Sequence, residues 1–120
     1  MSSSTLVEKT ASELSDLLSK KDISSLEIAQ ACLTQIDRVD GKVHAFLHRD
    51  DTDFLTQAKA SDERRGKGNL LGPLDGIPVA LKDVISVKGQ PLTAASKILQ
   101  NYISPYDATV TRKLKEAGAV

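Results

Sequence analysis

A change in residue composition at residue 72 places the strongest constraint on how this chain can fold. Glycine and proline recur between Gly72 and Pro78, and both residue types interrupt regular helices. The apolar run Ile77–Leu81 overlaps this stretch, and its length and β-branched residues are typical of a buried strand. We therefore predict a strand over Ile77–Leu81 and a second, shorter β-like piece over Val84–Val87.

Before residue 72 the sequence has a helical pattern. Thr10 is followed three positions later by Glu13, and Ser24 stands in the same relation to Glu27. A hydroxyl residue with a glutamate at this spacing forms a capping box, which satisfies the free N–H groups at the start of a helix. The two boxes predict one helix after Thr10 and another that runs from Ser24 to a stop at Gly41, and we expect these helices to form a hairpin.

A short strand and a third helix are expected next. Val43–Leu47 alternates weakly between apolar and polar residues and is assigned as the strand. Asp53 is the expected N-cap of a helix that runs to about Asp62, and the charged, glycine-containing stretch Arg64–Gly68 then ends the helical part. Residues 1–68 are therefore expected to form a helical region.

The last part of the chain has the pattern of an α/β unit. Asp107 is expected to cap a helix, and Gly118 is expected to end it. The strand Ile77–Leu81, this helix and the apolar pair Ala119–Val120 then follow the order strand, helix, strand, with the second strand cut short. We expect residues 69–120 to be the start of an α/β core and the chain to be truncated.

Composition argues against several classes of function. Basic and acidic residues balance at 16 each, so the segment has no basic surface of the kind that binds nucleic acid backbones. Cys32 is the single cysteine, so no internal disulfide can form, and a reducing cytoplasm or organelle matrix is expected. No apolar run approaches the ~18 residues that a membrane-spanning helix requires, so no membrane contact is expected.

Lys82 is the main candidate for chemistry, because it ends the predicted strand Ile77–Leu81 and precedes Asp83. Burial disfavours the charged ammonium form and lowers the pKa of a lysine, which can make the side chain a base at neutral pH. The alternative is a structural lysine whose ammonium group reaches solvent or pairs with Asp83.

The sequence offers no metal or cofactor site. His44 and His48 are four residues apart, but no further ligand completes a metal site. No glycine-rich phosphate loop is present, so any ATP is expected to bind elsewhere.

The stretch from Gly72 to Asp83 reads Gly-Pro-Leu-Asp-Gly-Ile-Pro-Val-Ala-Leu-Lys-Asp and closely resembles the lysine motif of the amidase-signature family. Similarity to the A-subunit branch of this family, found in tRNA-dependent amidotransferases, lies in Ala95–Leu99, Pro105–Val110 and Glu116–Ala119. Val84 and the stretch Gln90–Ala94 depart from the family pattern, which affects substrate positioning more than the family assignment.

The resemblance implies an amidase-signature α/β fold, in which N-terminal helices precede a mixed β-sheet covered by helices, with residues 1–120 as part of a single domain. It also implies a catalytic triad of a nucleophilic serine, a second serine in a cis peptide and a lysine, and Lys82 matches the lysine. Both serines and the oxyanion-hole amides are expected after Val120. Asp83 is expected to hold the adjacent loop, and Gly76 to provide a turn that supports the site.

The A-subunit branch implies a glutaminase that hydrolyses glutamine and supplies ammonia for the ATP-dependent conversion of Glu-tRNA(Gln) to Gln-tRNA(Gln), or of the equivalent aspartyl-tRNA(Asn). It implies B and C subunits as partners, ATP and Mg²⁺ used by one of these partners, and tRNA contacted through the complex rather than by this segment. Two alternatives stay open. One is a free-standing amidase that acts on another carboxamide, and the other is an inactive fragment that serves as a folding or interaction module.

Overall fold

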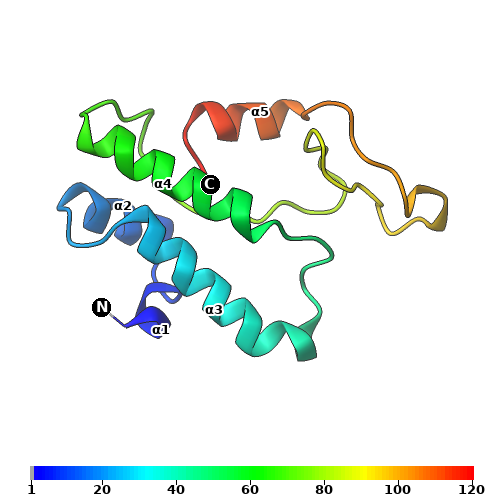
Figure 1. The fold of residues 1–120 in the computed structure, drawn as a ribbon, viewed down its shortest axis with the longest axis horizontal. Coiled ribbons are helices and arrows are strands. Elements are labelled where there is room, and N and C mark those ends of the chain that lie inside the picture. Colours follow the sequence, from blue (N-terminus) through cyan, green and yellow to red (C-terminus); the bar gives the residue numbers. More distant parts are fainter. Residues whose placement is uncertain (1) are drawn as a thin grey trace.

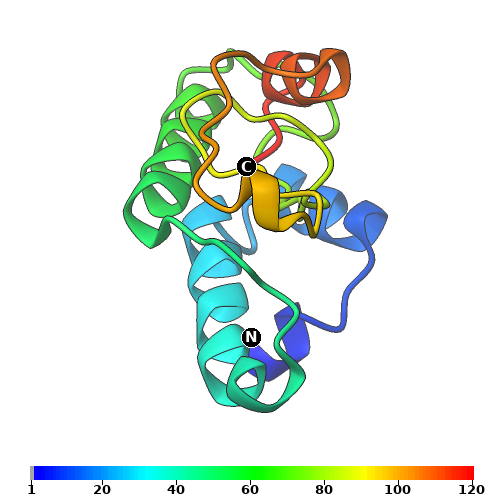
Figure 2. The same ribbon diagram turned by 90° about the vertical axis from the view of Figure 1, so that its right-hand side faces the viewer.

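The computed structural model describes residues 2–120, and helices dominate it. Its elements are α1 (Ser3–Leu6), α2 (Ala11–Ser19), α3 (Ser25–Val43), α4 (Asp51–Gly66), the 3-10 turn η1 (Lys97–Leu99) and α5 (Thr109–Glu116). Helix α3 packs against α1 and α4, and α5 lies at the end of the molecule opposite α1 (Figures 1 and 2). None of the helices in residues 2–120 is long and apolar enough to cross a membrane.

Both predicted capping boxes are confirmed. The hydroxyl of Thr10 accepts a hydrogen bond from the backbone N–H of Glu13, whose carboxylate accepts one from the backbone N–H of Thr10. Ser24 and Glu27 make the same reciprocal pair at the start of α3. Each cap contributes roughly 1 kcal/mol to helix stability, which is why the sequence pattern places these two helix starts correctly.

Helix α3 is longer than predicted and has a different partner. It continues through Gly41 to Val43, and His44 ends it in the left-handed conformation with φ of 53°. The strand predicted over Val43–Leu47 is therefore wrong, since its first residue is helical and the rest is irregular. The predicted hairpin of the first two helices is also wrong, because α3 packs against α1 and α4 and not along α2. The chain reverses direction through the loop after α3, and α4 lies beside α3 (Figure 1).

The N-cap of α4 is Asp50 rather than the predicted Asp53. The carboxylate of Asp50 accepts the backbone N–H of Asp53 at 3.0 Å, so the helix starts at Asp51, three residues before the predicted Phe54. Asp53 instead lies in the first turn and accepts a hydrogen bond from the side chain of Gln57. Several aspartates stand close together here, and any of them satisfies the capping pattern.

The hydrophobic core lies between the first helices and the segment after residue 72. Its buried members are Leu6, Leu14, Leu18, Ile23, Ile28, Ala31 and Ile77. Leu18 and Ile28 are 0% and 1% exposed, and full burial of such a side chain contributes roughly 1.5–3 kcal/mol. Ile77 therefore anchors the second half of the chain to the helices.

The predicted strands are not present among residues 2–120, where the stretches over Ile77–Leu81 and Val84–Val87 are irregular. A parallel pairing is nevertheless present. The N–H of Val79 donates to the carbonyl of Val120 at 2.8 Å, and the N–H of Val120 donates to the carbonyl of Ile77 at 2.9 Å. Two hydrogen bonds do not make a sheet, because strands are stable only with several partners. The mixed sheet and the division at residue 68 stay predictions.

Helix α5 ends as predicted but begins differently. Gly118, with φ of 81°, follows the last turn and ends the helix. The N–H of Ala119 donates a hydrogen bond to the carbonyl of Leu114. Asp107 is not its N-cap, since Ala108 occupies that position. The Asp107 carboxylate instead accepts the backbone N–H of Lys88 at 2.7 Å, so it joins the start of α5 to the loop that contains Lys88.

A carboxylate in α4 joins α4 to the start of α3. Asp62 accepts the backbone N–H of Ser25 at 2.7 Å and that of Leu26 at 3.0 Å. These N–H groups have no partner within their own helix, and the negative charge is favourable at the positive end of the helix dipole. The contact fixes the position of α3 relative to α4.

We predict that Asp62→Ala lowers the free energy of unfolding by roughly 1–2 kcal/mol, because the two N–H groups lose their acceptor. Urea denaturation followed by circular dichroism measures the change. Asp16→Ala, which removes an exposed carboxylate from α2, is the matched control and is expected to have little effect. Equal destabilisation by the two variants would contradict the assigned role of Asp62.

Candidate active site

The segment that carries Lys82 starts from a tightly packed turn at Gly76. The Gly76 carbonyl accepts the hydroxyl of Ser25 at 2.9 Å, and its N–H donates to the carbonyl of Gly118 at 2.9 Å. Gly76 has φ of 87°, and a Cβ atom here would lie 2.6 Å from the Ser61 hydroxyl and 2.9 Å from that of Ser25. Glycine is therefore required for this backbone conformation and for the close approach to α3 and α4.

Asp75, directly before this turn, is a buried carboxylate that the sequence analysis did not single out. Its side chain is 0% exposed, and its two oxygens accept hydrogen bonds from Arg64 Nη2 at 2.7 Å and Arg64 Nε at 3.1 Å. The backbone N–H of Leu71 adds a third bond, and Arg65 binds the Asp75 carbonyl. The available signal was an acidic residue inside an apolar stretch, with two arginines in the preceding helix.

The pKa of Asp75 reflects two opposing effects. Burial alone raises the pKa of the carboxyl, because it disfavours the charged form. The hydrogen bonds from Arg64 and Leu71, with the positive charge of Arg64, outweigh the burial and hold the pKa below its ordinary value. Asp75 is therefore ionised at neutral pH and fixes the turn to α4.

Lys82 is exposed, so its predicted burial at the end of a strand is wrong for this structure. The residues before it are also exposed, with Val79 at 38% and Leu81 at 37%, because no layer of residues 2–120 covers them. The Lys82 carbonyl accepts the N–H of Ile85 at 3.0 Å, which turns the chain immediately after the lysine. The catalytic role of Lys82 stays a prediction.

Asp83 holds the loop that follows Lys82. Its carboxylate accepts the backbone N–H of Thr93 at 2.8 Å and the Thr93 hydroxyl, and its carbonyl accepts the N–H of Ala94 at 2.9 Å. The Thr93 hydroxyl and N–H lower the pKa of Asp83. These bonds hold Ala94 and Ala95 in left-handed conformations with φ of 48° and 57°, which are costly for residues with a Cβ. Among the described residues, no ion pair joins Lys82 to Asp83.

An open cleft of about 400 Å³ lies between α3, α4, α5 and the segment that leads to Lys82. Its apolar lining includes Cys32, Ile36, Phe46, Phe54, Val79, Leu81, Leu114 and Val120. Burial raises the pKa of the Cys32 thiol, so this side chain acts as an apolar group in the wall. Lys82 directly follows the last cleft residue of its segment, so the lysine and the cleft are adjacent in the chain.

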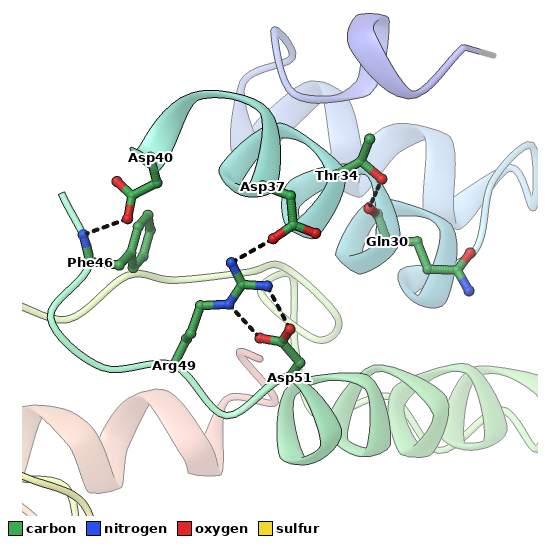
Figure 3. A network of polar contacts seen from close by, with 7 residues as sticks. All are labelled: Gln30, Thr34, Asp37, Asp40, Phe46, Arg49 and Asp51. Atoms are coloured by element: carbon green, nitrogen blue, oxygen red, sulfur yellow. Dashed lines mark hydrogen bonds and ion pairs between the residues drawn. The ribbon is translucent and has the colours of Figure 1, made fainter. Parts of the chain in front are cut away.

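A network around Arg49 positions the loop between α3 and α4, which forms one wall of the cleft (Figure 3). Arg49 Nη1 lies 2.8 Å from the carboxylate of Asp37, and Arg49 Nη2 lies 2.6 Å from that of Asp51. Hydrogen bonds to Asp51 and Asp37 raise the pKa of the Arg49 guanidinium. Asp40 accepts the backbone N–H of Phe46, so the loop is held at both ends.

In the part of the chain that the structure describes, no three histidine, cysteine or acidic side chains converge to form a metal site. His44 ends α3, and His48 lines the cleft.

Comparison with known proteins places this geometry in a family. Residues 27–120 match the family described as Amidase. The chain is 47% identical over 115 residues to the A subunit of glutamyl-tRNA(Gln) amidotransferase from Streptomyces avermitilis, and 50% identical over 115 residues to the same enzyme's A subunit from Thermobifida fusca. Each match covers 96% of this chain and 23% of the relative, so the chain spans less than a quarter of the relatives' length.

Solved structures agree with the sequence matches. The fold resembles native peptide amidase from Stenotrophomonas maltophilia with a TM-score of 0.87 and 34% sequence identity. The match covers 94% of this chain and 23% of the peptide amidase.

We predict that Asp75→Asn lowers the free energy of unfolding by about 1.5–3 kcal/mol at pH 7, because Arg64 and the Leu71 N–H lose a charged acceptor. The folded pKa of Asp75 lies below the unfolded value of about 3.9. Its stabilisation is therefore complete above that pH and is lost as the pH falls through the folded pKa.

Urea denaturation at several pH values tests this dependence. The difference between the original chain and Asp75→Asn is expected to be constant near neutral pH and to shrink below about pH 4. Asp22→Asn, at an exposed position, serves as the control. A difference that does not change with pH would contradict an ionised Asp75.

Proposed function

Because the chain belongs to the amidase family, we propose that it forms the lysine-bearing part of an enzyme that hydrolyses the side-chain amide of glutamine to glutamate and ammonia. The observation that carries the proposal is the lysine motif from Gly72 to Asp83, in a chain 47–50% identical to proteins named as the A subunit of glutamyl-tRNA(Gln) amidotransferase. The share of those relatives that this chain spans is small, so the activity belongs to a longer polypeptide.

In the proposed mechanism Lys82 is the base. Its neutral amine takes a proton from a serine held in a cis peptide, and this serine takes the proton of the nucleophilic serine. The nucleophile attacks the amide carbon, the proton held by Lys82 returns through the serine in the cis peptide to the amide nitrogen, and ammonia leaves. Water then gives a proton to the same base, attacks the acyl-enzyme and releases glutamate. We propose that both serines and the oxyanion-hole amides come from polypeptide beyond Val120, since no serine in this chain matches them.

The neighbours of Lys82 position it from both sides. On the N-terminal side, Gly76 and Asp75 fix the backbone against α3 and α4. On the C-terminal side, the Asp83 carboxylate binds Thr93 and so fixes the turn after the lysine. Effective proton transfer requires the base to lie within hydrogen-bond distance of its partner, so rigid support on both sides favours the assigned role.

We further propose that the ammonia passes to a partner protein that uses ATP and Mg²⁺ to amidate glutamate on misacylated tRNA. The relatives are each named as an A subunit, which supports an amidotransferase of several subunits as the assembly. We propose B and C subunits as the partners. Contact with tRNA is assigned to the complex, because this segment has equal numbers of basic and acidic residues. The expected location is the cytoplasm or an organelle matrix.

A second candidate is a free-standing amidase that acts on another carboxamide. The likeness to peptide amidase from Stenotrophomonas maltophilia favours it, although the sequence identity of 34% is lower than that to the amidotransferase subunits. A third candidate is an inactive folding or interaction module. Activity of the chimera described below towards glutamine and towards a peptide amide, measured side by side, separates the first two candidates, and absence of both activities favours the third.

The proposal is tested with a chimera in which this chain replaces the matching segment of the Streptomyces avermitilis relative. We predict that the chimera releases ammonia from glutamine and that Lys82→Ala lowers kcat by at least roughly a hundredfold, the size expected for loss of a general base. An enzyme-coupled assay for ammonia measures both rates.

Lys67→Ala removes an exposed lysine at the end of α4 and is the matched control, with unchanged kcat expected. Full activity of the Lys82→Ala chimera would refute the assignment of the base. Turnover by the 120-residue chain alone would refute the proposal that the nucleophile lies elsewhere.

A further inference from the structure

The turn that begins at Lys82 is held to another segment of the chain by polar contacts. The N–H of Ile85 donates to the Lys82 carbonyl at 3.0 Å, so Asp83 and Val84 are the two middle residues of the turn. Val84 is 57% exposed and Lys82 is also exposed, so burial of these side chains does not anchor the turn. Of the two middle residues, Asp83 is the one whose hydrogen bonds reach a distant segment.

Thr93 provides the side-chain contact to Asp83. Its hydroxyl and its backbone N–H both donate to the Asp83 carboxylate, the N–H at 2.8 Å. The next N–H, that of Ala94, donates to the Asp83 carbonyl at 2.9 Å. None of the salt bridges within residues 2–120 involves Asp83. The Thr93 hydroxyl therefore orients a carboxylate that has no cationic partner in this part of the chain.

Thr93 also holds a strained segment in place. Ala94 and Ala95 both have positive φ, and residues with a Cβ keep this conformation only where surrounding contacts enforce it. The Thr93 hydroxyl accepts the N–H of Ala95 at 3.3 Å, and the Thr93 carbonyl accepts the N–H of Ser96 at 2.8 Å. Strained backbone of this kind is concentrated at functional sites. A single hydroxyl thus joins the strained segment to the residue that follows Lys82.

The charge of Asp83 is matched to these donors. The Thr93 hydroxyl and N–H lower the pKa of the Asp83 carboxyl most, and the N–H groups of Ala95 and Ala94 lower it further. Asp83 is therefore ionised at neutral pH and acts as an acceptor only. Because the Thr93 hydroxyl gives its one proton to Asp83, its oxygen is free to accept the N–H of Ala95.

We propose that Thr93 is a positioning residue for the base Lys82, and that its hydroxyl acts through the Asp83 carboxylate and the turn between Lys82 and Ile85. This inference rests on the proposed function, because it concerns the proton transfer assigned to Lys82. Proton transfer depends steeply on the distance between base and donor, whereas substrate binding does not require the lysine to be in place. Loss of the hydroxyl therefore slows the chemical step without weakening substrate binding.

The first test is Thr93→Val in the chimera with the Streptomyces avermitilis relative. Valine keeps the shape of the side chain and the backbone N–H but removes the hydroxyl. We predict that kcat for ammonia release falls at least roughly tenfold, while KM stays within about twofold. Thr93→Ser retains the hydroxyl and is expected to keep kcat within about threefold of the unaltered chimera. A rise in KM with unchanged kcat overturns the proposal.

Thr52→Val, at an exposed position of α4, is the matched control and is expected to leave kcat and KM unchanged. Loss of activity equal to that of Thr93→Val would show a general effect of the substitution and overturns the proposal.

The second test combines Thr93→Val with Lys82→Ala. Two residues that act through one group have non-additive effects, so Thr93→Val is expected to cause no further loss of kcat once Lys82 is removed. A residue that serves the fold alone would lower the residual rate by the same factor in both backgrounds. Equal factors therefore overturn the proposal.

Hydrogen exchange tests the turn without requiring activity. The Ile85 N–H, which closes the turn on the Lys82 carbonyl, is expected to exchange at least roughly tenfold faster in the Thr93→Val chimera and at an unchanged rate in Thr93→Ser. Unchanged exchange in a folded Thr93→Val chimera overturns the proposal. If the unaltered chimera releases no ammonia, the glutaminase function fails, and faster exchange at Ile85 still supports control of the turn by Thr93.

Discussion

The close approach of the turn at Asp75 and Gly76 to helices α3 and α4 is the contact on which the rest of this structure depends. Gly76 can lie against Ser25 and Ser61 only because it has no Cβ, and Asp75 can be buried beside it only because Arg64 supplies the opposite charge. Together with the burial of Ile77 in the core, this contact fixes the position of the segment that carries Lys82 relative to the helical part. The turn therefore links the packing of the fold to the placement of the candidate base.

Much of the helical part could be predicted from local sequence, because its determinants are local. Capping boxes place the starts of α2 and α3, and a glycine with positive φ ends α5. Errors arose where several residues fit one pattern, as with Asp50 and Asp53, or where a glycine did not end a helix, since α3 continues through Gly41 to Val43. The strands predicted over Ile77–Leu81 and Val84–Val87 are absent from the described residues. A strand is harder to predict than a helix from local sequence, because its hydrogen-bond partners lie far away in the sequence.

In the candidate site, too, some features could be predicted from the sequence and others depend on the tertiary fold. The family motif identified Lys82, Asp83 and Gly76, and the structure shows how Asp83 and Gly76 contact their surroundings. The acidic residue in an apolar stretch was the only sequence signal for Asp75. Its pairing with Arg64 could not be predicted, because Arg64 lies in another element and the pairing depends on the tertiary fold. The exposure of Lys82 could not be inferred from the apolar residues before it. Burial depends on what packs over a segment as well as on its own composition.

The bond from Asp62 to the start of α3 has a consequence for the order of folding. It joins residues 37 positions apart, whereas the bond from Ser25 to Gly76 joins residues 51 positions apart. Contacts over shorter separations cost less loop entropy and form sooner, and synthesis on the ribosome delivers the N-terminal residues first. We infer that α3 and α4 pack together early, and that the turn at Gly76 then packs against this preformed pair of helices.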